Sequence, residues 1–223
     1  MLIPRYYFTN EYKDFYEYLL SKPHTEKKFS AGEYLWNLDK IIEKIYYIKS
    51  GITQTYIEHE EGYRKIISFH GEGTVFPGYH SLSFKIEKSI VTLALSDVET
   101  LEFSKEEFAQ MLQENQQLNT QILNWYASYV NLLLYETAHQ EYNSTFLKLC
   151  NLLYLFSQNS SEKNIIELTQ ENIASILAVN RVNAAKNLAR LRDEKIIIPH
   201  RKRLEIIDMP KLMKYCSLET LKP

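Results

Sequence analysis

Three side chains near the carboxyl end of the sequence have the types and the spacing needed to read DNA bases. Arg181, Val182 and Lys186 lie in the first two turns of a predicted helix, and Leu188 and Leu191 mark its buried side. At 100° per residue, Val182 and Lys186 face away from that side, and Arg181 lies at the exposed leading end. Arginine can donate two hydrogen bonds to guanine, lysine can reach guanine or a phosphate, and valine can contact only a thymine methyl. The pattern predicts a helix whose tip enters a major groove.

Other polar and basic side chains around this helix are expected to contact the phosphate backbone, which adds affinity without sequence information. They are Thr169, Asn180, Asn183, Arg190, Lys195, Arg201, Lys202 and Arg203. The chain as a whole has a net charge of -2, but residues 143–223 contain 13 Lys and Arg against 8 Asp and Glu. The basic character is therefore local, as a DNA-binding face requires.

A helix-turn-helix followed by a β-hairpin would position these side chains. Thr169 is a good N-cap for the first helix, and Ala174 is small enough for two helices to cross there. The link at 178–180 contains no glycine, and Asn180 can cap the second helix. The segment IIIPHRKRLEIID predicts a hairpin, and Asp208 can begin a last helix. We therefore predict a winged helix-turn-helix over residues 143–223. The alternative is a helical hairpin packed into a larger core, with a merely solvated basic face.

The first part of the chain has a different pattern. From Phe29 to Phe103, short runs rich in Ile, Val, Tyr and Thr are broken by glycine or polar turns about every eight to twelve residues. This spacing predicts a small all-β domain within residues 1–104, preceded by a short helix over residues 10–22.

A long helix is expected in residues 105–142, where neither glycine nor proline occurs. One apolar stripe has the 4,3 spacing of a two-stranded coiled coil, which predicts a homodimer. Its members are Leu118, Ile122, Trp125, Tyr129, Leu132 and Glu136, continued by His139. Beside it lies a second stripe of Leu123, Val130, Leu133 and Leu134. We assign one stripe to the β-domain and the first to the dimer; the alternative is a bundle helix buried in its own chain. A hinge is expected at residues 142–144.

In this order, the parts resemble the Crp/Fnr family of bacterial transcription regulators over nearly the whole chain. The resemblance rests on the segments KKFSAGEYLW, IEKIYYIKSGITQTYI and LTQENIASILAVNRVNAAKNLARLRDEKII. It implies an α+β fold with an N-terminal β-roll of the cyclic-nucleotide-binding type, a long dimerisation helix and a C-terminal winged helix-turn-helix. It further implies a homodimer on an inverted-repeat operator, with RNA polymerase as a further partner. The family's three base-reading positions fall on Arg181, Val182 and Lys186; glutamate is usual where Val182 stands, so a different operator is expected.

The same resemblance locates an effector pocket at Tyr79, Lys88, Ser89, Trp125 and Tyr126. Nucleotide-binding members hold the sugar and cyclic phosphate with Gly-Glu and Arg-Ser pairs, which here become Gly78-Tyr79 and Lys88-Ser89. Tyrosine cannot accept as a carboxylate does, and lysine lacks the planar fork of arginine. We therefore do not expect cyclic AMP as the effector, whose identity stays open. An aromatic or apolar molecule, haem through His80 or His139, or no small ligand at all are the alternatives.

Other classes of function find little support in the sequence. Cys150 and Cys216 stand in no metal-ligand spacing, so we expect neither a metal nor another bound cofactor. No catalytic motif occurs, so we do not expect an enzyme. No apolar run approaches the ~20 residues that cross a bilayer, so no membrane partner and a cytoplasmic location are expected. A non-enzymatic interaction module that binds a ligand or partner, without specific DNA binding, is the alternative.

Overall fold

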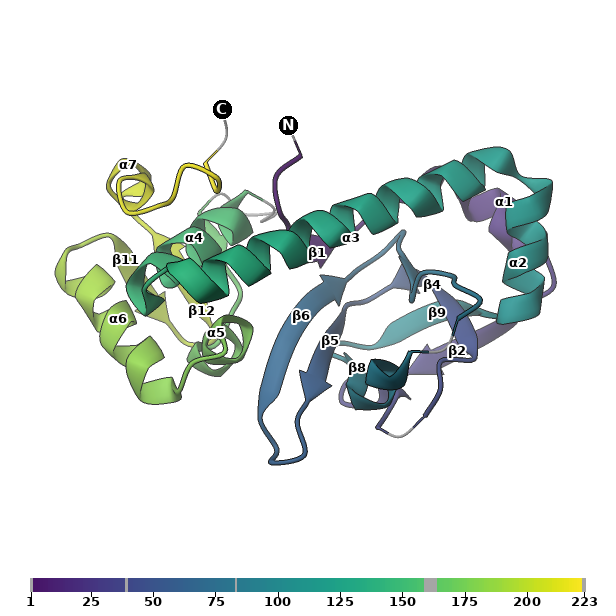
Figure 1. Cartoon of the computed structure of the whole chain (residues 1–223), viewed down its shortest axis with the longest axis horizontal. Coiled ribbons are helices and arrows are strands. Elements are labelled where there is room, and N and C mark those ends of the chain that lie inside the picture. The colour runs from purple at the N-terminus through teal and green to yellow at the C-terminus, as the bar shows by residue number, and fades with distance from the viewer. Residues whose placement is uncertain (1, 39, 83, 159–163, 222–223) are drawn as a thin grey trace. The chain divides into compact units, whose positions relative to one another are not determined.

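The computed structural model describes residues 2–38, 40–82, 84–158 and 164–221 (Figure 1). The chain divides into two compact units: residues 7–129 form the β-unit, and residues 1–6 with 130–223 form the C-terminal unit. This division differs from the predicted boundaries after residues 104 and 142. The reason is that the second half of the long helix and the first six residues pack with the C-terminal elements.

The described strands of the β-unit form two sheets, in which all neighbours are antiparallel except β1 and β6. The first sheet has the order β1 (Tyr7–Phe8), β6 (Arg64–His70), β5 (Thr53–Glu58), β8 (Ile90–Ala94) and β3 (Tyr34–Trp36). The second has the order β2 (Thr25–Phe29), β9 (Val98–Ser104), β4 (Lys44–Ser50) and β7 (Val75–Phe76). Short strands rich in β-branched and aromatic residues thus confirm the predicted β-domain.

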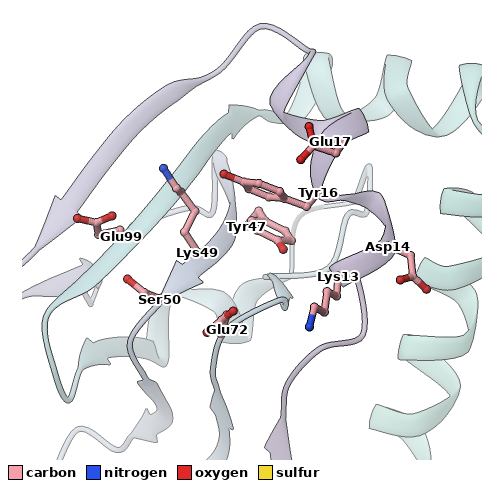
Figure 2. Close-up of a pocket in the computed structure, with 9 residues that line it drawn as sticks. All are labelled: Lys13, Asp14, Tyr16, Glu17, Tyr47, Lys49, Ser50, Glu72 and Glu99. Carbon is pink, nitrogen blue, oxygen red and sulfur yellow. The ribbon is translucent and has the colours of Figure 1, made fainter.

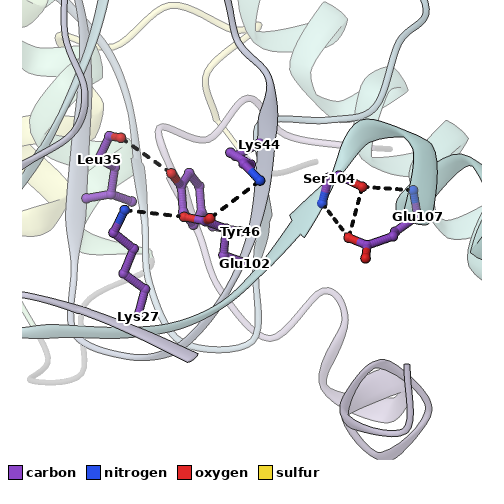
Figure 3. Close-up of polar contacts among 7 residues, drawn as sticks. All are labelled: Lys27, Leu35, Lys44, Tyr46, Glu102, Ser104 and Glu107. Carbon is purple, nitrogen blue, oxygen red and sulfur yellow. Dashed lines mark hydrogen bonds and ion pairs between the residues drawn. The ribbon is translucent and has the colours of Figure 1, made fainter. Parts of the chain in front are cut away.

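Polar contacts align the second sheet and start the helix that follows it, as Figure 3 shows. Glu102 of β9 lies between two lysines of its neighbouring strands, 3.5 Å from Lys27 and 3.7 Å from Lys44. Opposite charges across strands favour this register over one shifted by a residue. At the end of β9, the Ser104 hydroxyl accepts from the Glu107 N–H (3.1 Å), and Glu107 accepts from the Ser104 N–H (2.8 Å). This capping box turns the strand directly into α2 (Lys105–Glu114).

The region of the predicted long helix contains two helices, α2 and α3 (Gln116–Tyr142). Asn115 separates them: its backbone is extended, and its side chain accepts from the Leu118 N–H (3.0 Å). Asparagine is a good N-cap, so this break needs no glycine or proline. The chain does have a local break at 142–144, since α3 ends at Tyr142 and Ser144 caps the next helix. This break lies inside the C-terminal unit and not between the two units, where the hinge was expected.

Shorter helices complete the β-unit. The single helix expected over residues 10–22 is a 3-10 turn followed by one short helix. They are η1 (Lys13–Phe15) and α1 (Tyr16–Leu20), and a third turn is η2 (Lys85–Ser89). Nowhere in the described part of the chain is a helix both long and apolar enough to cross a membrane.

The C-terminal unit is a winged helix-turn-helix, as predicted. Its elements are α4 (Thr145–Ser157), β10 (Ile165–Ile166), α5 (Gln170–Leu177), α6 (Arg181–Asp193), β11 (Ile197–His200), β12 (Arg203–Ile206) and α7 (Met209–Met213). The hairpin of β11 and β12 gains a third strand, because β10 pairs with β12 on its other side. The α-helical and β-sheet parts together confirm the predicted α+β class.

Candidate nucleic-acid interface

The first helix of the helix-turn-helix, α5, is held at its start by a capping box. The Thr169 hydroxyl accepts from the Asn172 N–H (3.1 Å), and the Asn172 side chain accepts from the Thr169 N–H (3.1 Å). Its apolar side is buried as the sequence predicts, at Ile173, Ala174, Ile176 and Leu177. The cap and the buried side together fix where α5 begins and which face it turns inward.

The turn between α5 and α6 has a left-handed residue that is not glycine. Ala178 adopts φ +52° and ψ +46°, a conformation that costs an L-residue about 1 kcal/mol. The turn is closed by a backbone hydrogen bond from the Val179 N–H to the Ala174 carbonyl (3.0 Å). Asn180 then caps α6 by accepting from the Asn183 N–H (2.8 Å). The predicted link over residues 178–180 therefore exists, with its strain concentrated at Ala178.

The second helix, α6, presents the three predicted base-reading side chains on one exposed tip. Ala184, Leu188 and Leu191 are buried along the opposite side. Arg181, Val182 and Lys186 are exposed, and 75% of Val182 is accessible to solvent, which is unusual for so apolar a residue. The exposed Val182 side chain can contact a base methyl group, and the two flanking cations supply hydrogen-bond donors.

Two of the arginines of α6, Arg181 and Arg190, differ in their contacts. Arg181 forms an ion pair between its Nη2 and the Glu171 carboxylate, in which both side chains are about two-thirds exposed. Arg190 instead stacks on the Phe146 ring at 3.7 Å, and its Nε lies 3.0 Å from Glu194. Arg190 therefore holds α6 to its neighbours, whereas Arg181 can exchange its partner for a base.

The wing supplies a group of exposed cations. They are Arg201 and Lys202 in the turn between β11 and β12, Arg203 at the start of β12, and Lys195 just before β11. Among the residues that the structure describes, none of these four has an acidic partner within ion-pair distance. Uncompensated positive charge beside the α6 tip suits the phosphates that flank a groove.

The structure corrects the assignment of the first α3 stripe to a dimer seam. Leu118, Ile122, Trp125 and Leu132 are buried within a single chain, so they are not available to a second subunit. The exposed apolar side chains are those of the second stripe, and 63% of Leu123 and 67% of Leu134 are accessible. The 4,3 spacing occurs on both sides of α3, and spacing alone does not show which side the chain covers itself.

The polar ends of the first stripe also have partners in their own unit. The Tyr129 hydroxyl and the Ser68 hydroxyl are hydrogen-bonded at 3.1 Å in the β-unit. Glu136 accepts a hydrogen bond from the Tyr6 hydroxyl in the C-terminal unit. Each of these two side chains therefore has a hydrogen-bond partner within its own unit.

The residues expected around an effector are only partly together. Tyr79 and Tyr126 line a cleft of about 290 Å³ beside α2 and α3, and the Tyr126 hydroxyl donates to the Tyr79 carbonyl (2.9 Å). Lys88 and Ser89 lie on η2 and do not line this cleft. Trp125 is buried and belongs to a separate aromatic cluster.

That aromatic cluster fills part of the interior of the β-unit. The His70 ring stacks on Phe76, with ring centroids 3.6 Å apart, and Trp125 packs against both. Burial holds the pKa of His70 well below its usual value. Gly78 touches the same cluster: a Cβ at this position would lie 2.6 Å from Trp125 and 2.8 Å from Tyr126. The close approach of this loop to α3 therefore requires glycine.

A second cleft in the β-unit, of about 410 Å³, has charges of both signs (Figure 2). Its lining comprises Lys13, Asp14, Tyr16, Glu17, Tyr47, Lys49, Ser50, Glu72 and Glu99. The Tyr16 and Tyr47 rings lie 5.5 Å apart. Four carboxylates against two lysines make the lining a poor match for a phosphate. The described residues contain no group of three or more His, Cys, Asp or Glu side chains placed to bind a metal ion.

Two domain-family models match the chain. The cyclic nucleotide-binding domain model matches residues 26–115, and the Crp-like helix-turn-helix domain model matches residues 147–215. The cAMP-activated global transcriptional regulator CRP of Salmonella typhimurium is 26% identical over 199 residues, which cover 85% of this chain and 92% of that protein. CRP of Escherichia coli O157:H7 matches with the same identity and coverage.

Solved structures show the same fold. FixK2 from Bradyrhizobium japonicum superposes with a TM-score of 0.75 at 15% identity, covering 87% of this chain and 98% of that one. A mutant of CooA from Carboxydothermus hydrogenoformans gives 0.76 at 17% identity, covering 93% and 99%. The two domain models follow each other in the order of the β-unit and the winged helix-turn-helix. The match to CRP spans nearly the whole length of that protein. The chain therefore belongs to the Crp/Fnr family of transcription regulators.

Proposed function

We propose that this regulator acts as a homodimer that binds an inverted-repeat operator through the tips of its two α6 helices. The observation that carries the proposal is the exposed group Arg181, Val182 and Lys186 at the end of a helix whose other side is buried. Arg181 and Lys186 would donate to bases, and Val182 would contact a thymine methyl. Two such tips related by a two-fold axis would meet half-sites about one helical turn apart.

The phosphate contacts are proposed for a smaller set than the sequence suggests. Lys195, Arg201, Lys202, Arg203 and Asn183 are exposed and fit this role. Three others have structural partners: Thr169 and Asn180 use their side chains to cap helices, and Arg190 is held by Phe146 and Glu194. For these three we propose that they position α5 and α6 and do not contact DNA themselves.

The dimer contact is proposed for the exposed side of α3. Its members repeat at 4,3,4,3 spacing, as a two-stranded seam requires. They are Leu123, Ala127, Val130, Leu134 and Thr137, all exposed in the single chain. A second copy of the same helix would cover this row, since exposed leucine and valine in such a repeat are costly to leave in water.

We propose that cyclic AMP, which activates the CRP relatives, is not the effector of this chain. The turn that carries Lys88 also carries Glu87, which is buried, with its Oε1 3.1 Å from His80 Nε2. Burial, and then the charge of Glu87, raise the pKa of Tyr126 to about 12, so this carboxylate lies close to α3. A buried carboxylate next to the expected phosphate position would repel a cyclic phosphate. We further propose that the chain responds to a different effector, that RNA polymerase is a partner and that the protein is cytoplasmic.

Fluorescence anisotropy with DNA from upstream of the protein's own coding sequence tests the function. Arg181→Ala and Lys186→Ala should each weaken specific binding about 5- to 150-fold, as expected for lost base contacts. Lys214→Ala, which removes an exposed cation after α7, serves as the charge-matched control and should bind like the wild type. If the two α6 substitutions leave the affinity for DNA unchanged, or if no specific binding is found under any condition, a ligand- or partner-binding module is favoured instead.

A further inference from the structure

Gln140, near the end of α3, joins three helices of the C-terminal unit. Its side-chain amide donates to the Leu177 carbonyl at the end of α5 (3.4 Å) and to the Glu136 carboxylate (3.3 Å). Its side-chain oxygen accepts from Lys148 Nζ of α4 (3.0 Å), which also reaches the Gln140 backbone carbonyl (3.0 Å). Both contacts of the amide nitrogen are long, but together with the Lys148 contact they engage the nitrogen and the oxygen of the Gln140 side chain.

The N-terminal segment reaches the same group of residues. The Tyr6 hydroxyl donates to Glu136, the carboxylate that also receives the Gln140 amide. The Tyr6 ring is buried and stacks on Phe156 of α4, with centroids 5.6 Å apart. Nearby, the Asn131 amide donates to the Leu2 carbonyl (3.4 Å). Residues 2–6 are thus packed as part of the unit that contains the helix-turn-helix, although they lie more than a hundred positions away in sequence.

The Leu177 carbonyl directly precedes the strained residue of the turn. Ala178 has a left-handed backbone without being glycine, and such a conformation persists only where its surroundings impose it. The backbone bond from Val179 to Ala174 is one restraint. The Gln140 amide on Leu177 is a second, and it comes from a different helix. The angle between α5 and α6 depends on this turn, because Asn180 caps α6 only two residues later.

We propose that a positioning network holds the turn of the helix-turn-helix in its strained form. The network is the series of hydrogen bonds that joins Tyr6, Glu136, Gln140 and the Leu177 carbonyl. Residues 2–6 then contribute to the positioning of the DNA-reading helix. The contribution of the network to DNA affinity rests on the proposed function, but its effect on the turn does not. Tyr6 and Leu177 are buried and Glu136 and Gln140 are half-buried, so the network is proposed to act through Ala178 and the capped start of α6.

Two substitutions remove the network with little change in shape. Gln140→Met deletes the amide while keeping an unbranched side chain, and Tyr6→Phe deletes only the hydroxyl. Gln117→Met is the matched control, since Gln117 lies exposed on the same helix and its side chain has no hydrogen bond to another described residue. A complementary substitution, Ala178→Gly, relieves the left-handed strain and so removes the need for the network.

The first readout is amide hydrogen exchange at residues 175–182 of the full-length free protein. Gln140→Met should speed exchange there about threefold to tenfold, and Tyr6→Phe should do so to a smaller extent, as for the loss of one modest hydrogen bond. Adding Ala178→Gly to Gln140→Met should restore slow exchange. Wild-type exchange in Gln140→Met would overturn the proposal, and so would a failure of Ala178→Gly to restore it.

The second readout is binding to operator and to unrelated DNA. Gln140→Met should weaken operator binding about threefold to tenfold, with an unchanged salt dependence, because no phosphate contact is lost. An equal loss on unrelated DNA would contradict a positioning role. If the wild type shows no specific binding at all, the proposed function fails, while the exchange experiment still decides whether the network holds the turn.

Discussion

The guanidinium of Arg181 is ion-paired with the carboxylate of Glu171, so the leading cation of α6 is partly neutralised before any DNA arrives. Both side chains are exposed, and an exposed ion pair contributes only about 0–1 kcal/mol. Breaking it on binding therefore costs little. The pair can hold the Arg181 side chain near the tip of α6 without preventing its transfer to a guanine.

Glu171→Gln should strengthen operator binding by up to about fivefold, because Arg181 loses its competitor and a negative charge leaves the interface. Titration by anisotropy at low and physiological salt would measure this. Glu167→Gln removes the same charge from an exposed position that forms no ion pair with another described residue, and it reports any general charge effect. In an Arg181→Ala background the gain from Glu171→Gln should vanish; an undiminished gain there would show that the pair is irrelevant.

The exposed side of α3 gives a test of the dimer. Leu134→Glu combined with Val130→Glu should convert the protein to a folded monomer, because like charges would face each other across the seam. Sedimentation velocity measures the mass, and circular dichroism checks the fold. Asn124→Glu places the same charge on an exposed position outside the repeat and should leave the dimer intact.

The buried side of α3 should respond differently to the same kind of change. Leu132→Glu would bury an unpaired charge within one chain, so unfolding is expected rather than dissociation. A folded monomer from Leu132→Glu, together with an unaffected dimer in the double variant, would return the seam to the side first predicted.

Local signals in the sequence were sufficient for the helix-turn-helix. Thr169 and Asn180 act as N-caps where the sequence predicts them, and Leu188 and Leu191 are buried on the predicted side of α6. Each of these features depends on residues within one or two turns of the chain. The exposure of Arg181, Val182 and Lys186 follows from the same short-range geometry.

Features that depend on distant residues could not be predicted in this way. Which side of α3 faces its own chain is decided by partners such as Ser68, which lies far from Tyr129 in sequence. Arg190 is held away from the proposed DNA contacts by its stacking on Phe146. The third strand of the wing, β10, forms only through its pairing with β12. Asn115 is the exception, because an N-cap signal at this position was present and could have shown the break between α2 and α3.

The wing cations should control affinity but not specificity. Replacing Arg201, Lys202 and Arg203 by alanine should lower the slope of log affinity against log salt by about 2–3, since each phosphate contact contributes about 0.9. Operator and unrelated DNA should be weakened equally, so the specificity ratio should remain unchanged. Lys214→Ala is the control for a general loss of positive charge. A changed ratio would mean that the wing reads bases.

The close approach at Gly78 predicts a steric effect in the β-unit. Gly78→Ala would place a methyl group 2.6 Å from Trp125, so the loop or the ring must move. We expect a loss of about 1–3 kcal/mol in the free energy of unfolding, as for other overpacked sites. Urea unfolding followed by tryptophan fluorescence measures it, because Trp36 and Trp125 both lie in the β-unit. Ser81→Ala, an exposed change in the same loop, should have no effect.

His70 should make the stability of the β-unit depend on pH. Its buried ring is stacked on Phe76, its Nε2 lies 2.9 Å from the Ser68 hydroxyl, and burial lowers its pKa well below the usual value. Above a pH of about 6.5 the imidazole is neutral in both folded and unfolded chains, so its contribution to stability is fully present. Below that pH the unfolded chain binds a proton that the folded unit excludes. Stability should therefore fall by up to about 1.4 kcal/mol per pH unit until the lowered pKa is reached.

The pH effect can be isolated by comparing variants. Urea unfolding at pH 7.5 and 5.5 should show a loss for the wild type that exceeds the loss for His70→Gln by about 1 kcal/mol, because glutamine does not titrate. His59→Gln removes an exposed imidazole and should keep the wild-type pH dependence. If wild type and His70→Gln lose the same stability between these two pH values, then His70 is not excluded from protonation in the folded unit. That result would mean that the aromatic cluster around Phe76 and Trp125 accommodates a charged imidazole, contrary to the cost expected for burying an unpaired charge beside these rings.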